Sequence, residues 1–129
     1  MIVDTSALVA ILRDEPEREE FARLLLSTSA RISAANWLEA TMVADGSGDN
    51  GAGDRLDRIV ETAGLAIEPV TETHARAARI AFRRYGRGSG SPARLTFGDC
   101  FAYALSATSG EPLLFKGVDF THTDVLSAR

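Results

Sequence analysis

The stretch MIVDTSALVAIL, residues 1–12, opens the chain with an apolar run that ends in an acid. Met1 to Val3 is predicted to form a buried strand, Asp4 follows its end, and Ser6 to Leu12 is predicted to form a short helix. Open α/β sheets form their sites at the carboxyl ends of parallel strands. Asp4 is therefore a candidate site residue, although an acid here also serves as a helix N-cap.

Two further acids take comparable positions, and a third lies on a helix. Asp99 falls in the first turn of a helix that Thr96 is predicted to cap, Asp119 follows an apolar strand, and Glu39 lies on a helix between Asp4 and Asp99. Two unit charges about 4 Å apart repel by roughly 4 kcal/mol at an effective dielectric constant of 20. If these acids gather in one crevice, they therefore need a cation. Carboxylate oxygens favour Mg²⁺ or Mn²⁺, and the chain has no histidine or cysteine cluster of the kind that binds zinc.

Strands and helices alternate along the chain. This order is typical of a parallel sheet covered by helices on both faces. Gly46 to Asp54 is predicted to be a flexible loop, and THTDVL, residues 121–126, a short final strand. The other strands are predicted at residues 1–3, 31–33, 65–70 and 112–116, and the helices at 6–12, 16–26, 34–45, from Asp54 to Gly64, from Thr71 to Gly86 and from Thr96 to Gly110.

The composition is that of one ordinary globular domain. The 129 residues are 45% hydrophobic and 25% charged, which predicts a single domain over residues 1–129. No apolar stretch approaches the roughly 20 residues of a membrane span. No secretory signal is recognised, and one cysteine forms no internal disulfide. A cytoplasmic location is therefore expected.

Positive charge is concentrated in one stretch, although the formal net charge is −4. Between Arg76 and Gly98 there are six arginines and no acid, whereas the rest of the chain has eight basic and 18 acidic residues. At helical spacing such arginines form a strip suited to phosphate, and the alternative is a solvated helix face. The strip consists of Arg76, Arg79, Arg83 and Arg87.

Metal held by carboxylates would support hydrolysis of a phosphodiester bond. Thr5, Ser6 and Asn36 are candidates to hydrogen-bond the carboxylates or a metal-bound water, and helix capping is the alternative for each. Cys100 is interpreted as a small buried hydrophobe. The remaining polar and large side chains are assigned no chemistry: His74 and His122 as surface or capping residues, Trp37 and Met42 as core.

With these residues in place, the chain resembles the PIN-domain ribonucleases, and among them the VapC toxins of bacterial toxin–antitoxin pairs. The matching pieces occur in the family's order from end to end of the chain. They are MIVDTSALVAIL at the start, WLEA around Glu39, TFGDCFAYALS around Asp99 and LLFKGVDFTHTDV around Asp119. Val118 departs from the pattern, because an asparagine is common there, and Asp124 is ranked as accessory or structural.

The resemblance implies a three-layer α/β/α sandwich with a central, mainly parallel sheet. It implies a metal-dependent ribonuclease in which Asp4, Glu39, Asp99 and Asp119 are catalytic and bind one or two Mg²⁺ or Mn²⁺ ions. It also implies an RNA substrate, a homodimer and a cognate VapB-like antitoxin whose carboxyl-terminal segment covers the pocket. Apolar residues of the first helices are expected either to form a groove for that antitoxin or to be core: Val9, Leu12, Phe21 and Leu25.

Three alternatives stay open. A haloacid-dehalogenase-type phosphatase also begins with a strand that ends in aspartate, but its pattern has a second aspartate where this chain has Ser6. A phospho-accepting receiver domain would account for Lys116, yet it needs an aspartate at the end of the middle strand LAIEPV, residues 65–70. The third is an inactive PIN-fold module that only binds its antitoxin, which retention of all four acids disfavours.

Overall fold

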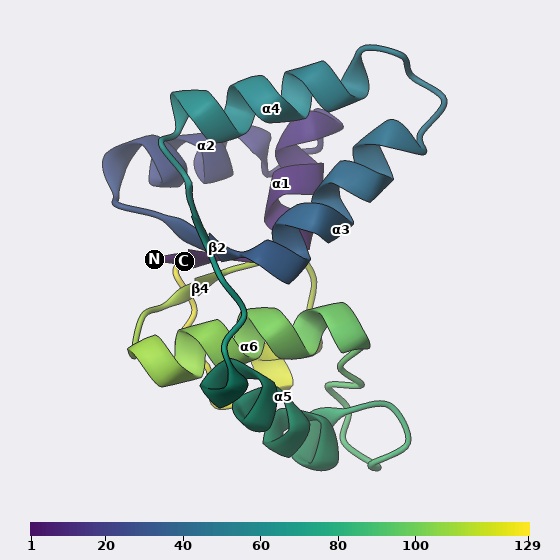
Figure 1. Cartoon of the computed structure of the whole chain (residues 1–129), viewed down its shortest axis with the longest axis vertical. Coiled ribbons are helices and arrows are strands. Elements are labelled where there is room, and N and C mark those ends of the chain that lie inside the picture. The colour runs from purple at the N-terminus through teal and green to yellow at the C-terminus, as the bar shows by residue number, and fades with distance from the viewer.

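The computed structural model describes residues 1–129 and contains a four-stranded sheet with helices on both faces (Figure 1). All strand pairs are parallel, and the strand order is β3-β2-β1-β4. The strands are β1 (Ile2–Val3), β2 (Arg31–Ser33), β3 (Ala66–Glu68) and β4 (Leu113–Leu114). The helices are α1 (Thr5–Leu12), α2 (Arg18–Ser27), α3 (Ala34–Asp45), α4 (Ala52–Thr62), α5 (Glu72–Tyr85), α6 (Phe97–Ser109) and the 3₁₀ helix η1 (Asp119–His122).

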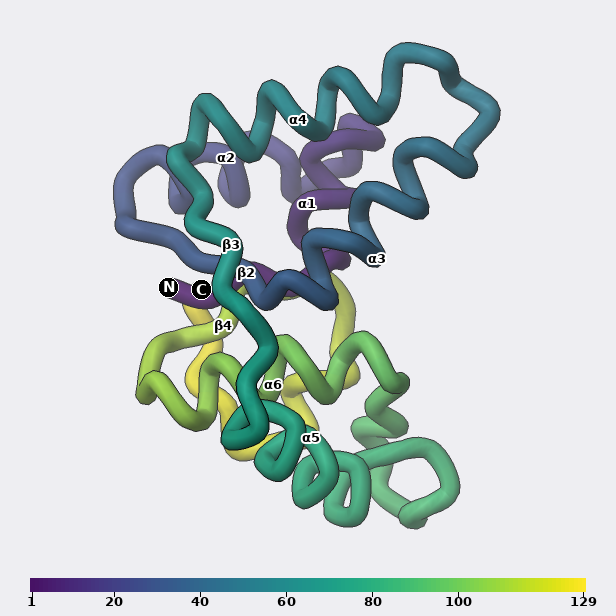
Figure 2. Tube along the Cα trace, in the orientation of Figure 1, coloured from purple at the N-terminus to yellow at the C-terminus, as the bar shows by residue number.

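The sheet separates two hydrophobic cores, as the predicted three-layer architecture requires. Helices α1 to α4 cover one face, and α5 and α6 cover the other, as the tube in Figure 2 also shows. Val3 and Leu114 point to the first core, whereas their neighbours Ile2 and Leu113 point to the second. This alternation follows from the two-residue period of a strand, and it explains why the strands are apolar at consecutive positions.

Local sequence signals determine where the helices that carry the acids begin. Asp4 is the N-cap of α1, Ser33 caps α3, and Thr96 caps α6 in a reciprocal capping box with Asp99. Gly110 ends α6 with φ 68°, in the left-handed region that glycine tolerates best. Asp4 and Asp99 therefore lie at helix starts that the chain specifies locally, and Glu39 lies in the second turn of α3.

Five predicted elements have other bounds or another form in the structure. Helix α4 begins at Ala52 rather than at Asp54, because Asp49 accepts a hydrogen bond from the Gly51 amide and forms the turn that starts it. Helix α2 begins at Arg18, two residues after the proline. The strands expected at 65–70 and 112–116 are shorter than predicted. The final segment forms η1 and one isolated bridge from Leu113 to Ser127 instead of a strand.

Of the two side chains expected in the core, one is partly buried and the other is exposed. Trp37 packs partly against the first core, but Met42 is 65% exposed on α3. His74 is a capping residue, as predicted, since its Nδ1 accepts a hydrogen bond from the Thr71 amide at 3.4 Å. None of the helices has both the length and the apolar character that a membrane span requires.

Candidate functional site

Asp4 lies at the carboxyl end of β1, in the middle of the sheet, and is only 3% exposed. Its Oδ2 accepts hydrogen bonds from the Ser6 amide (2.9 Å) and the Ser6 hydroxyl (2.5 Å), whereas its buried Oδ1 has no partner. The pKa of the Asp4 carboxyl is raised to about 6. Burial is the main cause and repulsion from Asp99 and Glu39 adds to it, whereas the hydrogen bonds from Ser6 act in the opposite direction. Asp4 is thus a buried acid without a basic partner.

Ser6 connects this acid to the neighbouring strand. The Ser6 Oγ accepts a hydrogen bond from the Lys116 amide at 2.9 Å, just beyond the end of β4, while it donates to Asp4. The Asp4 amide donates to the Leu114 carbonyl at 2.9 Å. The carboxylate is therefore held by two strands and by the first turn of α1.

Glu39 reaches this region from α3. Its carboxylate accepts a short hydrogen bond from the Thr5 hydroxyl and lies against Gly98 of α6. A Cβ atom built on Gly98 would be 2.8 Å from both Cδ and Oε1 of Glu39, which is closer than such atoms approach in proteins. Glycine at position 98 therefore provides the space that the carboxylate occupies.

Asn36, one turn before Glu39 on α3, is fully buried. Its Nδ2 donates to the Gly98 carbonyl at 2.9 Å and to the Thr5 hydroxyl at 3.5 Å, and its Oδ1 has no partner. Since only an amide nitrogen can donate to a carbonyl, the orientation of this side chain is fixed by its neighbours. Asn36 connects the three segments that carry the acids.

Asp99 lies on the first turn of α6 and is half-buried. Its Oδ2 accepts a hydrogen bond from the Thr96 amide at 2.8 Å, as part of the capping box. Its charge reaches Asp4, whose pKa it raises, and the adjacent Cys100, whose thiol pKa burial raises to about 11. Asp99 is therefore both a helix cap and a member of the acid group around Asp4.

The structure brings Asp4, Glu39 and Asp99 together. We call these three residues the acid site. Asp119 is exposed at the start of η1, and its charge is not among those that raise the pKa of Asp4. Asp124 is bound elsewhere, since it accepts a hydrogen bond from Tyr103 at 2.6 Å and lies 3.5 Å from Arg84.

The acid site has the oxygen donors that Mg²⁺ and Mn²⁺ prefer, but its carboxylates are not arranged around one ion. Its donors are carboxylate oxygens, and the Asp4 Oδ1 is buried without a partner. No three His, Cys, Asp or Glu side chains are arranged to hold one ion, and the Ser6 hydroxyl, the Thr5 hydroxyl and the Thr96 amide each engage one carboxylate. The chemistry of the donors therefore fits a hard divalent cation.

The arginine strip is only partly free of acids. Arg79 and Arg83 are exposed on α5 without an ion-pair partner, whereas Arg76 pairs with Glu72 one turn earlier at 3.3 Å. Arg87 lies beyond the end of α5, so it does not continue the strip along the helix. The sequence pattern overlooked Glu72, which precedes the acid-free stretch.

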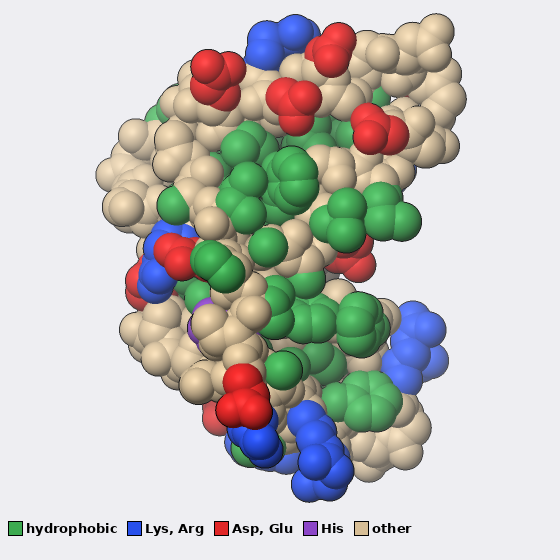
Figure 3. Space-filling model, in the orientation of Figure 1, with side chains coloured by type: hydrophobic (Ala, Val, Ile, Leu, Met, Phe, Trp, Pro, Cys, Tyr) green, Lys and Arg blue, Asp and Glu red, His purple; other side chains and the backbone are tan.

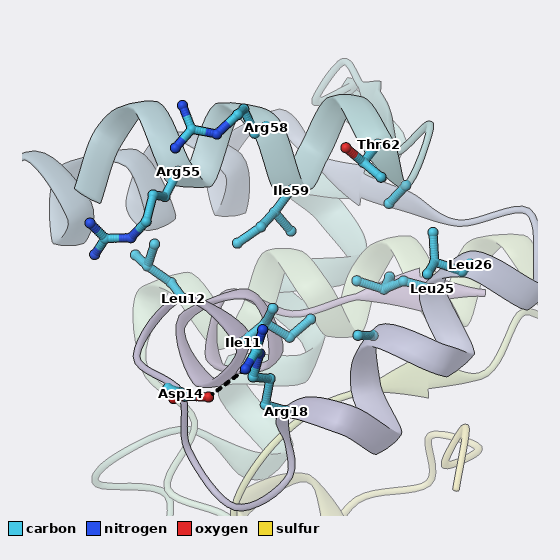
Figure 4. Close-up of a pocket in the computed structure, with 12 residues that line it drawn as sticks. Ile11, Leu12, Asp14, Arg18, Leu25, Leu26, Arg55, Arg58, Ile59 and Thr62 are labelled. Carbon is cyan, nitrogen blue, oxygen red and sulfur yellow. Dashed lines mark hydrogen bonds and ion pairs between the residues drawn. The ribbon is translucent and has the colours of Figure 1, made fainter. Parts of the chain in front are cut away.

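A second surface feature is an apolar groove of about 600 Å³ between α1, α2 and α4 (Figure 4). Leu12 and Leu25 line it, as expected of the first helices, together with Ile59 of α4. Phe21 is fully buried and belongs to the core instead. Arg55 and Arg58 project from α4 at the rim (Figure 4). Arg55 pairs with Asp49 at 2.7 Å, whereas Arg58 has no ion-pair partner, so the groove combines an apolar floor with one unpaired cation on α4.

Gly98 is the residue of the site that sequence reasoning missed. It lies between Phe97 and Asp99 near the start of a helix, where glycine is unfavourable. A glycine next to a candidate acid in a helical stretch was the available signal, because it indicates a close approach of another group.

Comparison with known proteins gives a consistent set of relatives. The family model of the PIN domain matches residues 1–126. The chain is 50% identical to Ribonuclease VapC28 of Mycobacterium tuberculosis over 129 residues, covering 99% of this chain and 97% of that protein. It is 44% identical to Ribonuclease VapC30 of the same species over 126 residues, covering 97% and 95%.

Solved structures share the fold at low sequence identity. Mycobacterium tuberculosis VapC20, described as a sarcin-ricin loop cleaving toxin, is similar with a TM-score of 0.78 at 18% identity, over 99% of this chain and 98% of that one. FitAcB from Neisseria gonorrhoeae has a TM-score of 0.72 at 20% identity, over 99% and 96%. A toxin–antitoxin complex from Klebsiella pneumoniae has a TM-score of 0.69 at 16% identity, over 92% and 88%. The three-layer architecture is thus a shared one.

Proposed function

This chain belongs to the PIN-domain family, among proteins of the VapC type, and we propose that it is a metal-dependent endoribonuclease that acts as the toxin of a toxin–antitoxin pair. One observation carries the proposal: Asp4 is buried with an unpartnered Oδ1 and a raised pKa, beside two further acids and no basic side chain. Such an arrangement costs stability in the free protein. A bound cation offsets that cost and gives the arrangement a use.

The cation proposed is Mg²⁺ or Mn²⁺, held by Asp4, Glu39 and Asp99, with Asp119 as a further candidate. The carboxylate-only donor set supports a hard ion. When bound, it supplies a water of lowered pKa and stabilises charge on the phosphate. Asp119 is exposed at the start of η1, just beyond the end of β4, and would complete the set from there.

The protein's own residues hold these carboxylates in place. Ser6 fixes one oxygen of Asp4 and leaves the other free, and Thr5 orients Glu39. The amide of Asn36 connects Thr5 with Gly98, so the spacing between α3 and α6 is fixed beside the acids. Arg79 and Arg83, which have no ion-pair partner, would hold the RNA backbone, because one guanidinium group can donate two parallel hydrogen bonds to two oxygens of a phosphate.

We propose a VapB-like antitoxin as the protein partner. The names of the relatives support this, and so does the Klebsiella pneumoniae structure of similar fold, which was solved as a toxin–antitoxin complex. The apolar groove beside α1, α2 and α4 is the proposed binding site for an amphipathic segment of that antitoxin, since most of the side chains that line it are apolar.

We also propose that the chain is one domain over residues 1–129, located in the cytoplasm, and that it forms a homodimer. Leu38 and Met42 support the dimer, because these two apolar side chains lie one turn apart on α3 and are 52% and 65% exposed. The α3 surface that carries them is the proposed contact between copies.

The test is RNA cleavage by the purified protein with Mg²⁺, Mn²⁺ or a chelator. We expect cleavage only with metal, and a loss of about 10²- to 10⁴-fold in Asp99→Asn, since metal stabilisation of the transition state is worth several kcal/mol. Glu19→Gln, an exposed acid on α2, is the control. A folded Asp99→Asn protein of full activity would overturn the assignment.

Metal binding has its own readout. A cation that binds only the folded protein raises its free energy of unfolding by about 2.7 kcal/mol at 100 times the dissociation constant. We expect Mn²⁺ to stabilise the parent and to stabilise Asp99→Asn less. A melting temperature that is indifferent to metal and chelator, together with absent cleavage, would favour the inactive binding module instead.

A further inference from the structure

An aromatic slot opens between α5 and α6, next to the acid site but outside it. Its volume is about 260 Å³, and its walls are almost entirely apolar. We define the aromatic slot by three rings, those of Phe82, Phe97 and Phe101, and by Arg79, which also lines it. Figure 3 shows hydrophobic side chains gathered over α5 and α6, with Lys and Arg side chains along the lower edge of the same face.

Phe97 is the unusual member of this slot. It is 81% exposed, more than any other large hydrophobic side chain of the protein. Its ring lies 4.8 Å from that of Phe101 at 84°, so the neighbour orients the ring while most of it stays in solvent. An exposed, oriented ring is a surface on which another flat group can stack.

The slot adjoins the acid site through consecutive residues. Phe97 lines the slot, Gly98 receives the carboxylate of Glu39, and Asp99 belongs to the acid site. A flexible strand that placed one group in the slot would therefore place the following part of its backbone beside the acids. The order of these three residues therefore sets the path of a bound strand, from the slot towards the acid site.

The charge around the slot favours a polyanion over a second copy of this chain. Arg79 and Arg83 have no ion-pair partner, and no acid occurs between residues 76 and 98. A two-fold contact centred on this face would place α5 against α5 of the second copy and bring like charges together. Unpaired bases stack on aromatic side chains while arginines bind their phosphates.

We propose that the aromatic slot binds one unpaired base of an RNA strand, stacked on Phe97, with Arg79 on an adjoining phosphate. The strand then continues into the acid site. The proposal rests on the proposed ribonuclease function, and it adds the group that selects single-stranded RNA and sets where the backbone lies.

The experiment measures binding in chelator, so that no strand is cut and binding is separate from nuclease activity. The probes are an oligoadenylate of about eight nucleotides and an all-abasic ribose-phosphate strand of the same length. The variants are Phe97→Leu, which keeps an apolar side chain but loses the ring, Phe97→Tyr, which keeps the ring, and Arg79→Ala. Leu126→Ala is the control, since Leu126 is 66% exposed near the carboxyl terminus.

We expect Phe97→Leu to weaken oligoadenylate binding roughly five- to hundredfold, the usual range for stacking of one base. The abasic strand should be bound equally by Phe97→Leu and the parent, and Phe97→Tyr should behave as the parent with both probes. Arg79→Ala should weaken both strands, because its contact is with phosphate.

Three results would overturn the aromatic slot as a base site. One is unchanged oligoadenylate binding in Phe97→Leu, another is an equal loss for both strands, and the third is a change from dimer to monomer in Phe97→Leu by sedimentation, which would assign the slot to a second copy. If instead the base effect is found and no RNA is cleaved with metal, the ribonuclease proposal fails while the slot stands.

Discussion

Acidic side chains lie at both ends of β1, and the two ends differ in what accompanies them. At the amino end, Glu111 accepts a hydrogen bond from the Met1 amino group at 2.7 Å and forms an ion pair with Arg31. These partners hold the pKa of Glu111 below its usual range, the amino group contributing most. At the carboxyl end, Asp4 has no basic partner, and burial raises its pKa to about 6.

The comparison separates charges that stabilise the fold from charges that cost it stability. A paired acid is retained for its ion pair, which a stability argument explains. A buried, unpaired acid beside two others has no such explanation, and acids with perturbed pKa values are typical of functional sites. The difference between the two ends of β1 therefore supports the acid site as the candidate functional site, independently of any relative.

The largest effect is expected from the pH dependence of stability in chelator. Because the pKa of Asp4 is raised from 3.8 to about 6, its contribution to the free energy of unfolding is fully present below pH 3.8 and is lost as the pH rises through 6. The loss is about 3 kcal/mol by linkage. Asp4→Asn, which has no charge to bury, should therefore be more stable than the parent above pH 6 and similar to it near pH 4.

Urea denaturation of both proteins between pH 4 and pH 8 measures this difference. If the two stability profiles run parallel over that range, Asp4 is not held protonated by the fold, and the contrast between the two ends of β1 is lost.

The next effect is expected from Gly98→Ala. The added methyl would displace the Glu39 carboxylate, and removal of such a supporting interaction typically costs about 10- to 100-fold in metal affinity or activity. Alanine favours a helix over glycine by about 1 kcal/mol, so the variant should stay folded. Cleavage rates with Mn²⁺, alongside melting temperatures, separate the two effects.

Gly53→Ala is the matched control. Gly53 also lies in a helix, and its Cβ would meet the carboxylate of Asp45 as that of Gly98 would meet Glu39. The control should cleave RNA at the parental rate. Equal losses in both variants would mean that the effect comes from the helix and not from the acid site.

A smaller effect is expected at the opposite end of β1. Glu111→Gln removes a partner of both the Met1 amino group and Arg31, and both pairs are partly exposed. We expect a loss of about 1–2 kcal/mol in the free energy of unfolding at neutral pH. RNA cleavage should not change, because the acid site is untouched. A large loss of cleavage in a folded Glu111→Gln protein would remove the distinction between structural and functional acids.

Most of the fold followed from short-range signals in the sequence. Thr96 and Gly110 specify the ends of α6 by capping, and consecutive apolar residues specify the buried strands. The segment from Gly46 to Gly51 was harder, since a side-chain turn at Asp49 starts α4 despite the glycines around it. In the last segment, Phe120 of η1 packs against Phe115, with 5.1 Å between the ring centroids. No local sequence pattern specifies this contact.

The candidate site was predictable in its members and less so in its geometry. Asp4 and Asp99 were found at a strand end and a helix start, Glu39 was found within a predicted helix, and the structure places the three together. The exposed position of Asp119 depends on how η1 packs, which the sequence does not specify. The pairing of Arg76 with Glu72 was missed because the acid lies one helical turn before the arginine stretch and not within it.

The smallest effect concerns the positive charges that lack partners, which extend the same comparison to cations. Arg31 is held by two acids, whereas Arg79 and Arg83 are held by none. Replacing both Arg79 and Arg83 with alanine should make RNA binding less dependent on salt. The slope of log K against log salt concentration should become shallower by about 0.7 for each phosphate of a single strand that is no longer neutralised. The position of cleavage should stay the same, because the acid site is intact.

The affinity for RNA is measured against salt concentration in an Asp99→Asn background, so that the RNA is not cut. The double variant Arg13→Ala with Arg23→Ala is the control, since these arginines are also exposed and unpaired. An equal change of slope in both double variants would show that net charge alone matters, and an unchanged slope in the first would return its arginines to the solvated face of α5.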